Sequence, residues 1–282
     1  MKFFKCVAAA SVFALLFSMS LSSRRLNATP PIGTDRLQVV LAMTYQSNVK
    51  WSSSKDIEIL RKYASDGKTY LKDSYSKNTT YYGLPYSQIA NDSTGTFISN
   101  FDGNNGSATL ADVISGNKIT LKGSYLNSHN LSSCSLGNDC STAVALAWAS
   151  RCSGMNYKNI STLDFLDCAQ TGSNSSYHMK TLGGYSIGNK YTTEYCNTTN
   201  DSIRQKVYGY YDQLKSGDSL FYRKSSKGHA MLVTSTGKDY VIVTEQCGLS
   251  GTSSWKTSKK YTYDELYNKG YLPVYCTGYS RY

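Results

Sequence analysis

One stretch in the middle of the chain places the strongest demand on the fold: residues 142–149 read Thr-Ala-Val-Ala-Leu-Ala-Trp-Ala. Placed on a helix, this run is apolar on every side, which is typical of a buried helix and not of an amphipathic surface helix. The rest of the chain must therefore supply elements that cover this helix all round. Asp139, Cys140 and Ser141 come directly before the run, so we expect Cys140 at the start of the helix.

The first 28 residues have the pattern of a secretory signal peptide. Lys2 and Lys5 precede an apolar run, 7–21, that is too short for a comfortable transmembrane helix. Ala28 is a plausible cleavage point, cleavage several residues earlier fits as well, and an uncleaved N-terminal anchor is the alternative. We expect export to the cell exterior or the cell wall, with no membrane span after cleavage.

Charge narrows the partners of the exported chain. Cleavage would remove four positive charges and lower the formal net charge from +11 to +7. A basic exported protein suits anionic surfaces such as cell-wall polymers or membranes. No run of Lys and Arg interleaved with aromatic residues occurs, which argues against nucleic acid as a partner.

Cysteine use predicts at least one free thiol. Cys6 belongs to the signal segment, and seven cysteines remain in the mature chain: Cys134, Cys140, Cys152, Cys168, Cys196, Cys247 and Cys276. Because seven is odd, at least one thiol stays unpaired or bonds elsewhere in an oxidising compartment. No C-x-x-C pair exists and the three histidines are scattered, so we expect no zinc site and no other cofactor.

The C-terminal half has the pattern of an α+β fold, in which the buried helix is followed by an antiparallel sheet. The expected elements are helices at 203–214 and 263–267 and strands at 219–222, 229–234, 240–246 and 272–275. Gly237-Lys238 is the expected turn of a hairpin between the second and third strands. Nearer the N-terminus, residues 56–64 carry helical spacing after an N-cap candidate at Ser54 or Asp56.

Cys140 and His229 are the candidates for chemistry. A helix N-terminus carries about half a positive charge, and its N–H groups can hold an oxyanion when a carbonyl is attacked. Cys140 is therefore a potential nucleophile, although its position alone fits a disulfide partner equally well. Gly228-His229 opens a strand, where a histidine often satisfies only a local hydrogen bond. His129 and His178 lie in loops rich in Ser and Asn, where a surface role is expected.

Two blocks resemble a known family. Gly137-Asn138-Asp139-Cys140-Ser141, followed by the apolar helix, resembles the Asp-Cys-Ser nucleophile motif of NlpC/P60 cysteine peptidases and amidases. The sequences at 216–222 and 228–233 resemble that family's Gly-Asp strand and Gly-His strand, in the same order. The resemblance runs from Gly83 to the C-terminus and implies a papain-like fold, with the helix of Cys140 packed on an antiparallel sheet.

The resemblance also implies a reaction. His229 would deprotonate Cys140, which attacks an amide carbonyl to form an acyl-enzyme that water then hydrolyses. The implied substrates are peptide or amide bonds, above all those of bacterial cell-wall peptidoglycan. A transglutaminase-like acyl transferase using the same pair is one alternative, and a non-catalytic cell-wall-binding protein with a decayed site is another.

The third catalytic residue has two candidates. In the family, the residue that orients the histidine lies on the next strand, and related cell-wall amidases place a Glu at the position of Glu245. A two-residue Gly237-Lys238 turn would instead set Gln246 opposite His229, unless a bulge restores Glu245. Either side chain can accept a hydrogen bond from the imidazole ring.

The family pattern further assigns boundaries and substrate contacts. It implies a catalytic domain at 81–282 with an insertion at about 151–215, whose cysteines suggest that disulfides hold it in place, after the signal peptide at 1–28 and an N-terminal helical extension at 29–80. Asp139, Ser141 and Gly228 would line the pocket, as would Tyr86, for which Tyr125 is a rival.

Overall fold

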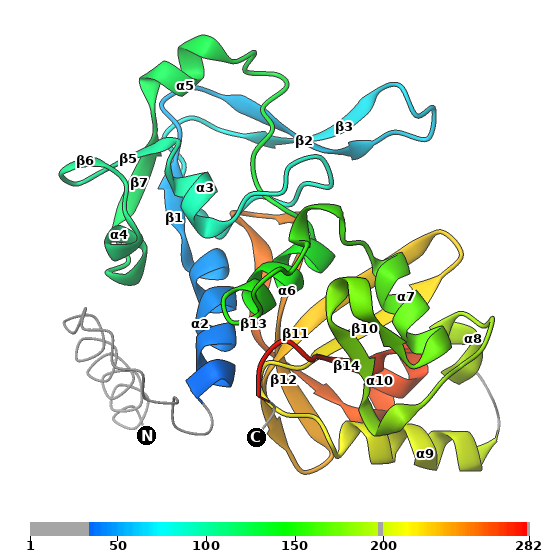
Figure 1. The fold of residues 1–282 in the computed structure, drawn as a ribbon. Coiled ribbons are helices and arrows are strands. Elements are labelled where there is room, and N and C mark those ends of the chain that lie inside the picture. Colours follow the sequence, from blue (N-terminus) through cyan, green and yellow to red (C-terminus); the bar gives the residue numbers. More distant parts are fainter. Residues whose placement is uncertain (1–33, 197–199, 281–282) are drawn as a thin grey trace. The chain divides into compact units, whose positions relative to one another are not determined.

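The computed structural model describes residues 34–196 and 200–280 (Figure 1). The predicted signal peptide at 1–28 lies outside these ranges. The described residues all belong to one compact unit. Among the described residues, no helix combines the length and the apolar character that crossing a membrane requires.

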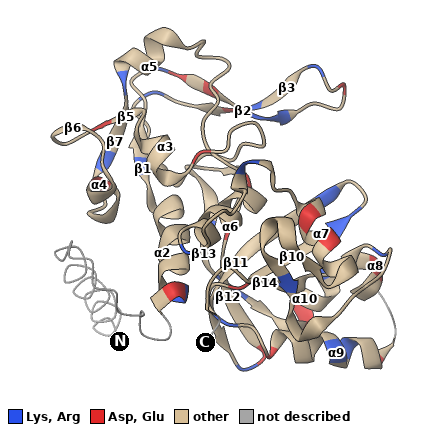
Figure 2. Cartoon of the chain, in the orientation of Figure 1, with Lys and Arg blue, Asp and Glu red and all other residues tan. Residues whose placement is uncertain are grey.

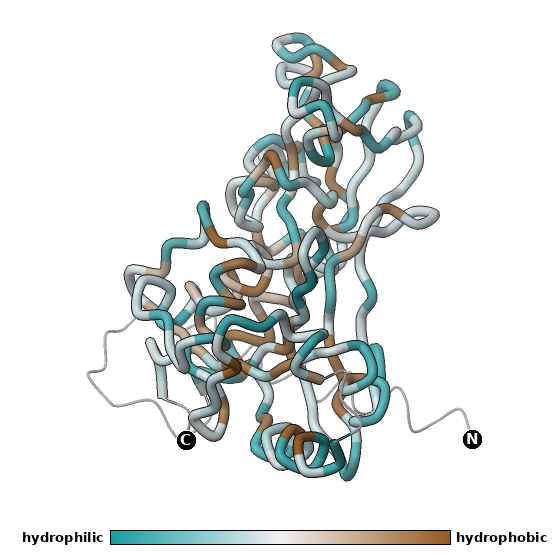
Figure 3. Tube along the Cα trace, turned by 90° about the vertical axis from the view of Figure 1, so that its right-hand side faces the viewer, coloured by the Kyte–Doolittle hydropathy of each residue, from teal (hydrophilic) through white to brown (hydrophobic). Residues whose placement is uncertain are grey.

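The predicted buried helix is present as α6, Cys140–Ala149. It packs against helix α2, Thr34–Asn48, and against strands β11, Lys227–Gly237, and β12, Tyr240–Ser250. Side-chain hydrogen bonds to backbone oxygens tie α6 to its cover: Gln46 Nε2 donates to Ala143 O over 3.0 Å, and Trp148 Nε1 donates to Gly217 O over 2.8 Å. Apolar residues line the interior of the trace in Figure 3, and Trp148 has no exposed surface.

A twelve-stranded mixed sheet lies at the centre of the fold, in the order β6-β5-β7-β1-β4-β13-β12-β11-β10-β14-β9-β8. Two neighbouring pairs, β1–β7 and β4–β13, are parallel, and the other pairs are antiparallel. Its remaining strands are β1 Lys50–Ser52, β4 Tyr81–Tyr82, β5 Phe101–Gly103, β6 Gly106–Ser107, β7 Lys118–Leu121, β8 Ser173–Asn174, β9 Met179–Thr181, β10 Ser219–Lys224, β13 Ser253–Thr262 and β14 Leu272–Cys276.

Short helices fill the connections. They are α3 Thr94–Ile98, α4 Leu110–Ile114, α5 Gly123–Ser128, η1 Tyr157–Asn159, α7 Thr162–Thr171, η2 Ser175–Tyr177, η3 Leu182–Gly184, α8 Thr192–Cys196, α9 Asp201–Tyr211 and α10 Tyr263–Lys269. The predicted helices near 203–214 and 263–267 and the four predicted C-terminal strands are confirmed by α9, α10, β10, β11, β12 and β14.

The helix predicted at 56–64 is wrong. This segment is strand β2, Ile57–Tyr63, which pairs with β3, Tyr70–Tyr75, in a separate two-stranded sheet. Ile57 and Ile59 are buried and alternate with the half-buried Glu58, whose N–H donates to Leu131 O over 2.7 Å. Pairing with β3 and this bond to a residue more than seventy positions away favour the strand. Within the helical extension expected at 29–80, residues 34–48 form helix α2, and strands β1, β2 and β3 follow it.

The hairpin between β11 and β12 differs from its prediction by one residue. The two-residue turn is Lys238-Asp239 instead of Gly237-Lys238, and Asp239 adopts a left-handed φ of 60°. A bulge between Val233 and Ser235 then shifts the register. Both changes alter which residue of β12 faces His229.

The insertion at 151–215 extends the sheet through β9, which pairs with β14. Cys152, Cys168 and Cys196, which were expected to form disulfides, are buried and unbonded in this structure, and the side chain of Cys152 is in hydrogen-bond contact with that of Cys276. Burial raises the pKa of Cys168 and of Cys196 to about 12. Apolar packing and strand pairing hold the segment in place.

A buried ion pair joins α2 to the strand that follows the insertion. Arg36 Nη2 lies 3.1 Å from Asp218 Oδ1, and the Arg36 guanidinium also donates to Ser216 O. The Asp218 side chain has no exposed surface, and its other oxygen accepts from Lys215 N over 2.9 Å. Arg36 of helix α2 thus neutralises the buried carboxylate of Asp218, in the Gly217-Asp218 motif.

We expect Arg36→Ala to lower the free energy of unfolding by about 3–5 kcal/mol, because it removes one partner of a buried ion pair. Arg151→Ala is the matched control: it breaks the Arg151–Asp35 pair, whose side chains are 35% and 20% exposed, and should cost less than about 1 kcal/mol. Urea unfolding followed by circular dichroism measures both. Equal losses would contradict the structural role of Arg36.

Candidate active site

Cys140 is the first residue of α6, and Asp139 is its N-cap. Asp139 Oδ1 accepts from Thr142 N over 2.8 Å and from Ser141 Oγ over 3.0 Å. Burial raises the pKa of Asp139 above its ordinary value, despite these hydrogen bonds, which lower it. Cys140 is only 5% exposed. The cap fixes the backbone at the point where the helix presents its sulfur.

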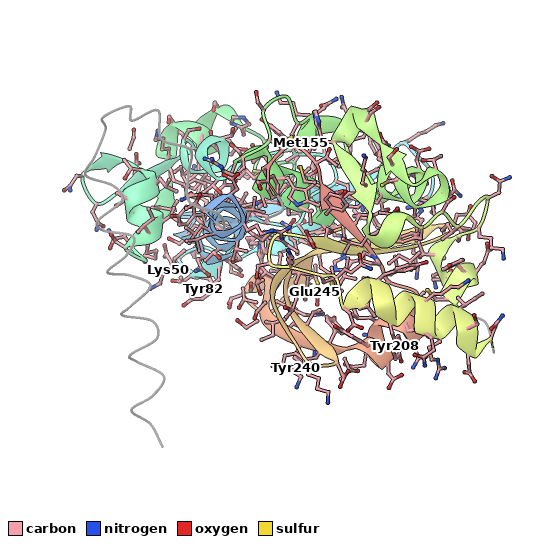
Figure 4. The ribbon with its side chains drawn as sticks, turned by 60° about the horizontal axis from the view of Figure 1, so that its bottom comes forward. Lys50, Tyr82, Met155, Tyr208, Tyr240 and Glu245 are labelled. Atoms are coloured by element: carbon pink, nitrogen blue, oxygen red, sulfur yellow. The ribbon has the colours of Figure 1, made fainter. Side chains whose placement is uncertain are left out.

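His229 lies on β11 and contacts Glu245 on β12. Its Nε2 is 2.6 Å from Glu245 Oε2, and the two side chains are 15% and 3% exposed. Glu245 Oε1 accepts from Tyr261 Oη over 2.9 Å and lies 3.9 Å from Lys256 Nζ. Figure 4 labels Glu245, which lies in the middle of β12, and Tyr240, the first residue of the same strand. Glu245 is therefore held on both oxygens, in a position that orients the ring of His229.

Electrostatics favour a protonated His229. Burial lowers the pKa of His229, but the charge of Cys140, a hydrogen bond with Cys140 and the contact with Glu245 outweigh it and raise the pKa to about 10. Burial likewise raises the pKa of Glu245, and the bond and charge of His229 outweigh it, so that this pKa is lowered. Because Nε2 faces Glu245, Nδ1 is the nitrogen left for Cys140.

Gln246 has a different partner from the one the hairpin count suggested. Its Nε2 donates to Leu84 O over 3.2 Å and to Pro85 O over 3.0 Å, and the residue is fully buried. Trp255 Nε1 donates to the same Leu84 oxygen over 2.8 Å. Gln246 thus positions the segment that leads into Tyr86, while Glu245 contacts the histidine.

Tyr86 lies beside the thiol, although it is 54 positions away in the sequence. It forms an isolated parallel bridge with Asn138, two residues before Cys140. Burial, followed by the charges of Cys140 and Asp139, raises the pKa of Tyr86 well above its ordinary value, so the hydroxyl keeps its proton. Tyr86 Oη accepts from Gln88 Nε2 over 2.8 Å, which leaves its own hydrogen available to a ligand.

The rival tyrosine is elsewhere. Tyr125 stacks on His129 with ring centroids 3.9 Å apart, and the charges that act on it come from Cys134 and Asp92. His178 lies at the end of η2, where its backbone oxygen accepts from Thr277. Neither Tyr125, His129 nor His178 lines the two cavities that border Cys140 and His229.

Two hollows meet at the candidate site. One, of about 570 Å³, is lined by Cys140, Asp139 and Ser141, and the other, of about 630 Å³, is lined by His229 and Glu245. Tyr86, Tyr222 and Gly228 line both hollows. The sulfur of Cys140 and the imidazole of His229 therefore line two adjoining hollows. Because these hollows share three residues, we describe them together as one groove.

Gly228 is required by a close approach. A Cβ at this position would meet Thr162 Oγ1 at 2.2 Å, at the start of α7. The glycine thus lets the insertion contact the strand of His229, and Arg223 Nη1 donates to the same Thr162 oxygen over 3.0 Å. The insertion forms part of the wall of the first hollow through residues 158–162.

Basic residues surround the groove. The lining of the first hollow contains four basic residues, Lys62, Lys158, Arg223 and Lys227, and one acidic residue, Asp139. The second is lined by Lys224, Lys256 and Lys269, with Glu245 as its acidic residue. Figure 2 colours all Lys and Arg of the described chain blue and all Asp and Glu red. The lining favours an anionic ligand.

Several site residues escaped the sequence reasoning. Tyr261 and Lys256 hold Glu245 from β13, and Cys247 lies close to His229 and Glu245, with one donor atom of each of the three within 4.8 Å of the others. The chain contains 25 tyrosines, and nothing in the sequence distinguishes Tyr261 from the others. The strand register that brings β13 beside β12 would have been the necessary signal.

Comparison of the chain with protein-family models, with curated proteins and with solved structures gave no match.

The contact with Glu245 predicts a measurable pH dependence. We expect Glu245→Gln to lower the midpoint of the His229 titration from about 10, by about 1 to 3 pH units, because a negative charge next to the imidazolium is lost. Two-dimensional NMR of the imidazole ring measures the midpoint, and the ring signals of His129 and His178 should not change between the two proteins.

The same shift links stability to pH. Because the pKa of His229 is raised on folding, the protonated ring stabilises the fold below pH 6.5, and this contribution is lost as the pH rises through about 10. An unchanged His229 midpoint in Glu245→Gln would show that the carboxylate does not set the protonation of the ring.

Proposed function

We propose that this chain is a secreted cysteine hydrolase with a papain-like site of the NlpC/P60 type, cleaving peptide or amide bonds. The observation that carries the proposal is the arrangement of three side chains: Cys140 at the start of a buried helix, His229 interacting with it, and Glu245 at 2.6 Å from the far nitrogen of the ring. A nucleophile, a base and a group that orients the base are the parts that such catalysis needs.

The reaction would begin with the proton of Cys140 already on His229, whose pKa is raised to about 10. Since Nε2 is bonded to Glu245, the proton is received on Nδ1, and the carboxylate stabilises the imidazolium that forms. The sulfur attacks the substrate carbonyl, and His229 then gives its proton to the leaving amine. Water, deprotonated by His229, releases the acyl group from the sulfur.

Two groups are placed to stabilise the oxyanion. At the start of α6, the N–H of Thr142 already donates to the Asp139 carboxylate. The first donor for the oxyanion is therefore the N–H of Cys140, at the same end of the helix. The Tyr86 hydroxyl, whose oxygen accepts from Gln88, is a second donor in the lining of the groove. Both are fixed before substrate binds.

The charge of the groove supports a negatively charged substrate. Lys62, Lys158, Arg223 and Lys227 border the first hollow, and a polymer with many carboxylates would be attracted to them. We propose the peptides of bacterial peptidoglycan as the substrate class, reached by export through a cleaved signal at 1–28.

The decisive test is release of amines from purified peptidoglycan by the mature protein. Cys140→Ala and His229→Ala should each reduce the rate by at least about a thousandfold, because nucleophile and base act as a unit. Cys134→Ala removes another buried thiol, at a distance from the groove, and should retain the rate. Equal release by the wild type and Cys140→Ala would refute the proposal.

Tyr86→Phe tests the second oxyanion donor. We expect kcat to fall about 10² to 10³-fold with little change in KM, because the lost hydrogen bond forms in the transition state. Tyr125→Phe, in the rival position, is the matched control and should leave kcat unchanged. A change confined to KM would assign Tyr86 to ground-state binding.

A further inference from the structure

Cys247 is a second thiol at the candidate active site, with no part in the mechanism above. It follows Glu245 by two positions on β12, so both side chains lie on the same face of the strand. One donor atom from each of His229, Glu245 and Cys247 lies within 4.8 Å of the other two. Cys247 is half-buried, and like His229 and Glu245 it lines the second hollow, which gives access from solvent.

The three donors match a particular class of metal ion. Zinc takes nitrogen, thiolate sulfur and carboxylate oxygen at about 2.0–2.3 Å, which places adjacent ligand atoms about 3.3–3.8 Å apart. Side-chain movements of about 1 Å would bring the three donor atoms to that spacing. Three protein ligands leave a fourth position for water. Calcium and magnesium, which prefer oxygen ligands alone, do not fit a set that contains sulfur and imidazole.

We propose that His229, Glu245 and Cys247 form a binding site for Zn²⁺ or a similar thiophilic divalent cation, and that occupancy of this site switches off His229 as a base. The sequence spacing argued against a zinc site because no C-x-x-C pair exists and the histidines are scattered. Two neighbouring strands bring the ligands together instead.

Inhibition follows from the chemistry of the imidazole. The metal binds Nε2, in place of the proton shared with Glu245, and Cys247 binds as thiolate after releasing its proton to solvent. A neutral ring with a metal on Nε2 carries its proton on Nδ1. The lone pair that would accept the proton of Cys140 is then absent, so the base is lost while the sulfur itself stays unligated.

Neighbouring charges set the strength of binding. Lys256 Nζ lies 3.9 Å from Glu245 Oε1 and is 58% exposed, and Lys224 and Lys269 line the same hollow. Burial, and then the negative charge of Glu245, raises the pKa of Cys247 to about 11, so the metal must displace a firmly held proton. Both effects weaken binding, which makes the site reversible.

Binding is tested first, by titrating the metal-free mature protein with Co²⁺ and following the thiolate-to-cobalt charge-transfer absorption. We expect Cys247→Ser to weaken Co²⁺ binding at least tenfold, because removing even a residue that only supports a ligand costs about that much. Cys134→Ser changes a buried thiol elsewhere and should bind Co²⁺ as the wild type does. Lys256→Ala should tighten binding about twofold to fivefold. An undiminished absorption in Cys247→Ser, or a loss of it in Cys140→Ser alone, would overturn the site.

Inhibition is tested second, and this part rests on the proposed function. Zn²⁺ should slow amide hydrolysis by the wild type at least tenfold, with recovery on adding EDTA, and should lose this effect in Cys247→Ser when each protein is compared with its own metal-free rate. Full turnover at a saturating Zn²⁺ concentration would refute the switch. A wild type without any hydrolytic activity would refute the proposed function, while the Co²⁺ titration would still decide the site.

Discussion

The burial of α6, in which every residue except the half-buried Leu146 and Ala149 is buried, is the constraint on which the rest of the structure depends. Because the helix is apolar on every side, α2 must cover one side and β11 with β12 another, and the backbone groups at its N-terminus are then the part that reaches the groove. Cys140 sits at that end. The same packing that satisfies the hydrophobic effect therefore aims the thiol at the strand of His229.

Support around the site comes from segments that are far apart in the chain. Gln246 and Trp255 hold the backbone oxygens at Leu84 and Pro85, and these contacts place Tyr86 next to the thiol. Tyr261 holds Glu245, which in turn orients His229. Tyr86, Glu245 and His229 are thus held by residues of neighbouring strands, as precise positioning of reacting groups requires.

The sequence predicted the parts that local pattern controls. The buried helix, the four C-terminal strands and the candidates Cys140, His229 and Glu245 could be selected because periodicity or a motif marks each one. The segment 56–64 was misjudged because pairing with β3 and a bond to Leu131 outweigh its helical spacing, and the choice between Glu245 and Gln246 depended on a bulge that no local pattern encodes. Tyr261, Lys256 and Cys247 could not be found because strand register alone brings them to the site.

The contacts that cover α6 also bear on how the chain acquires its structure. Gln46 meets Ala143 across 97 residues, and Arg36 meets Asp218 across 182. Contacts of such separation make folding slow, because the loops must close before the contacts can compensate for the lost entropy. During synthesis the apolar helix emerges well before β11 and β12, and it must be shielded from aggregation until they follow. A translocated chain would meet this problem beyond the membrane, where the helper proteins of that compartment, and not ribosome-bound chaperones, would have to provide the shielding.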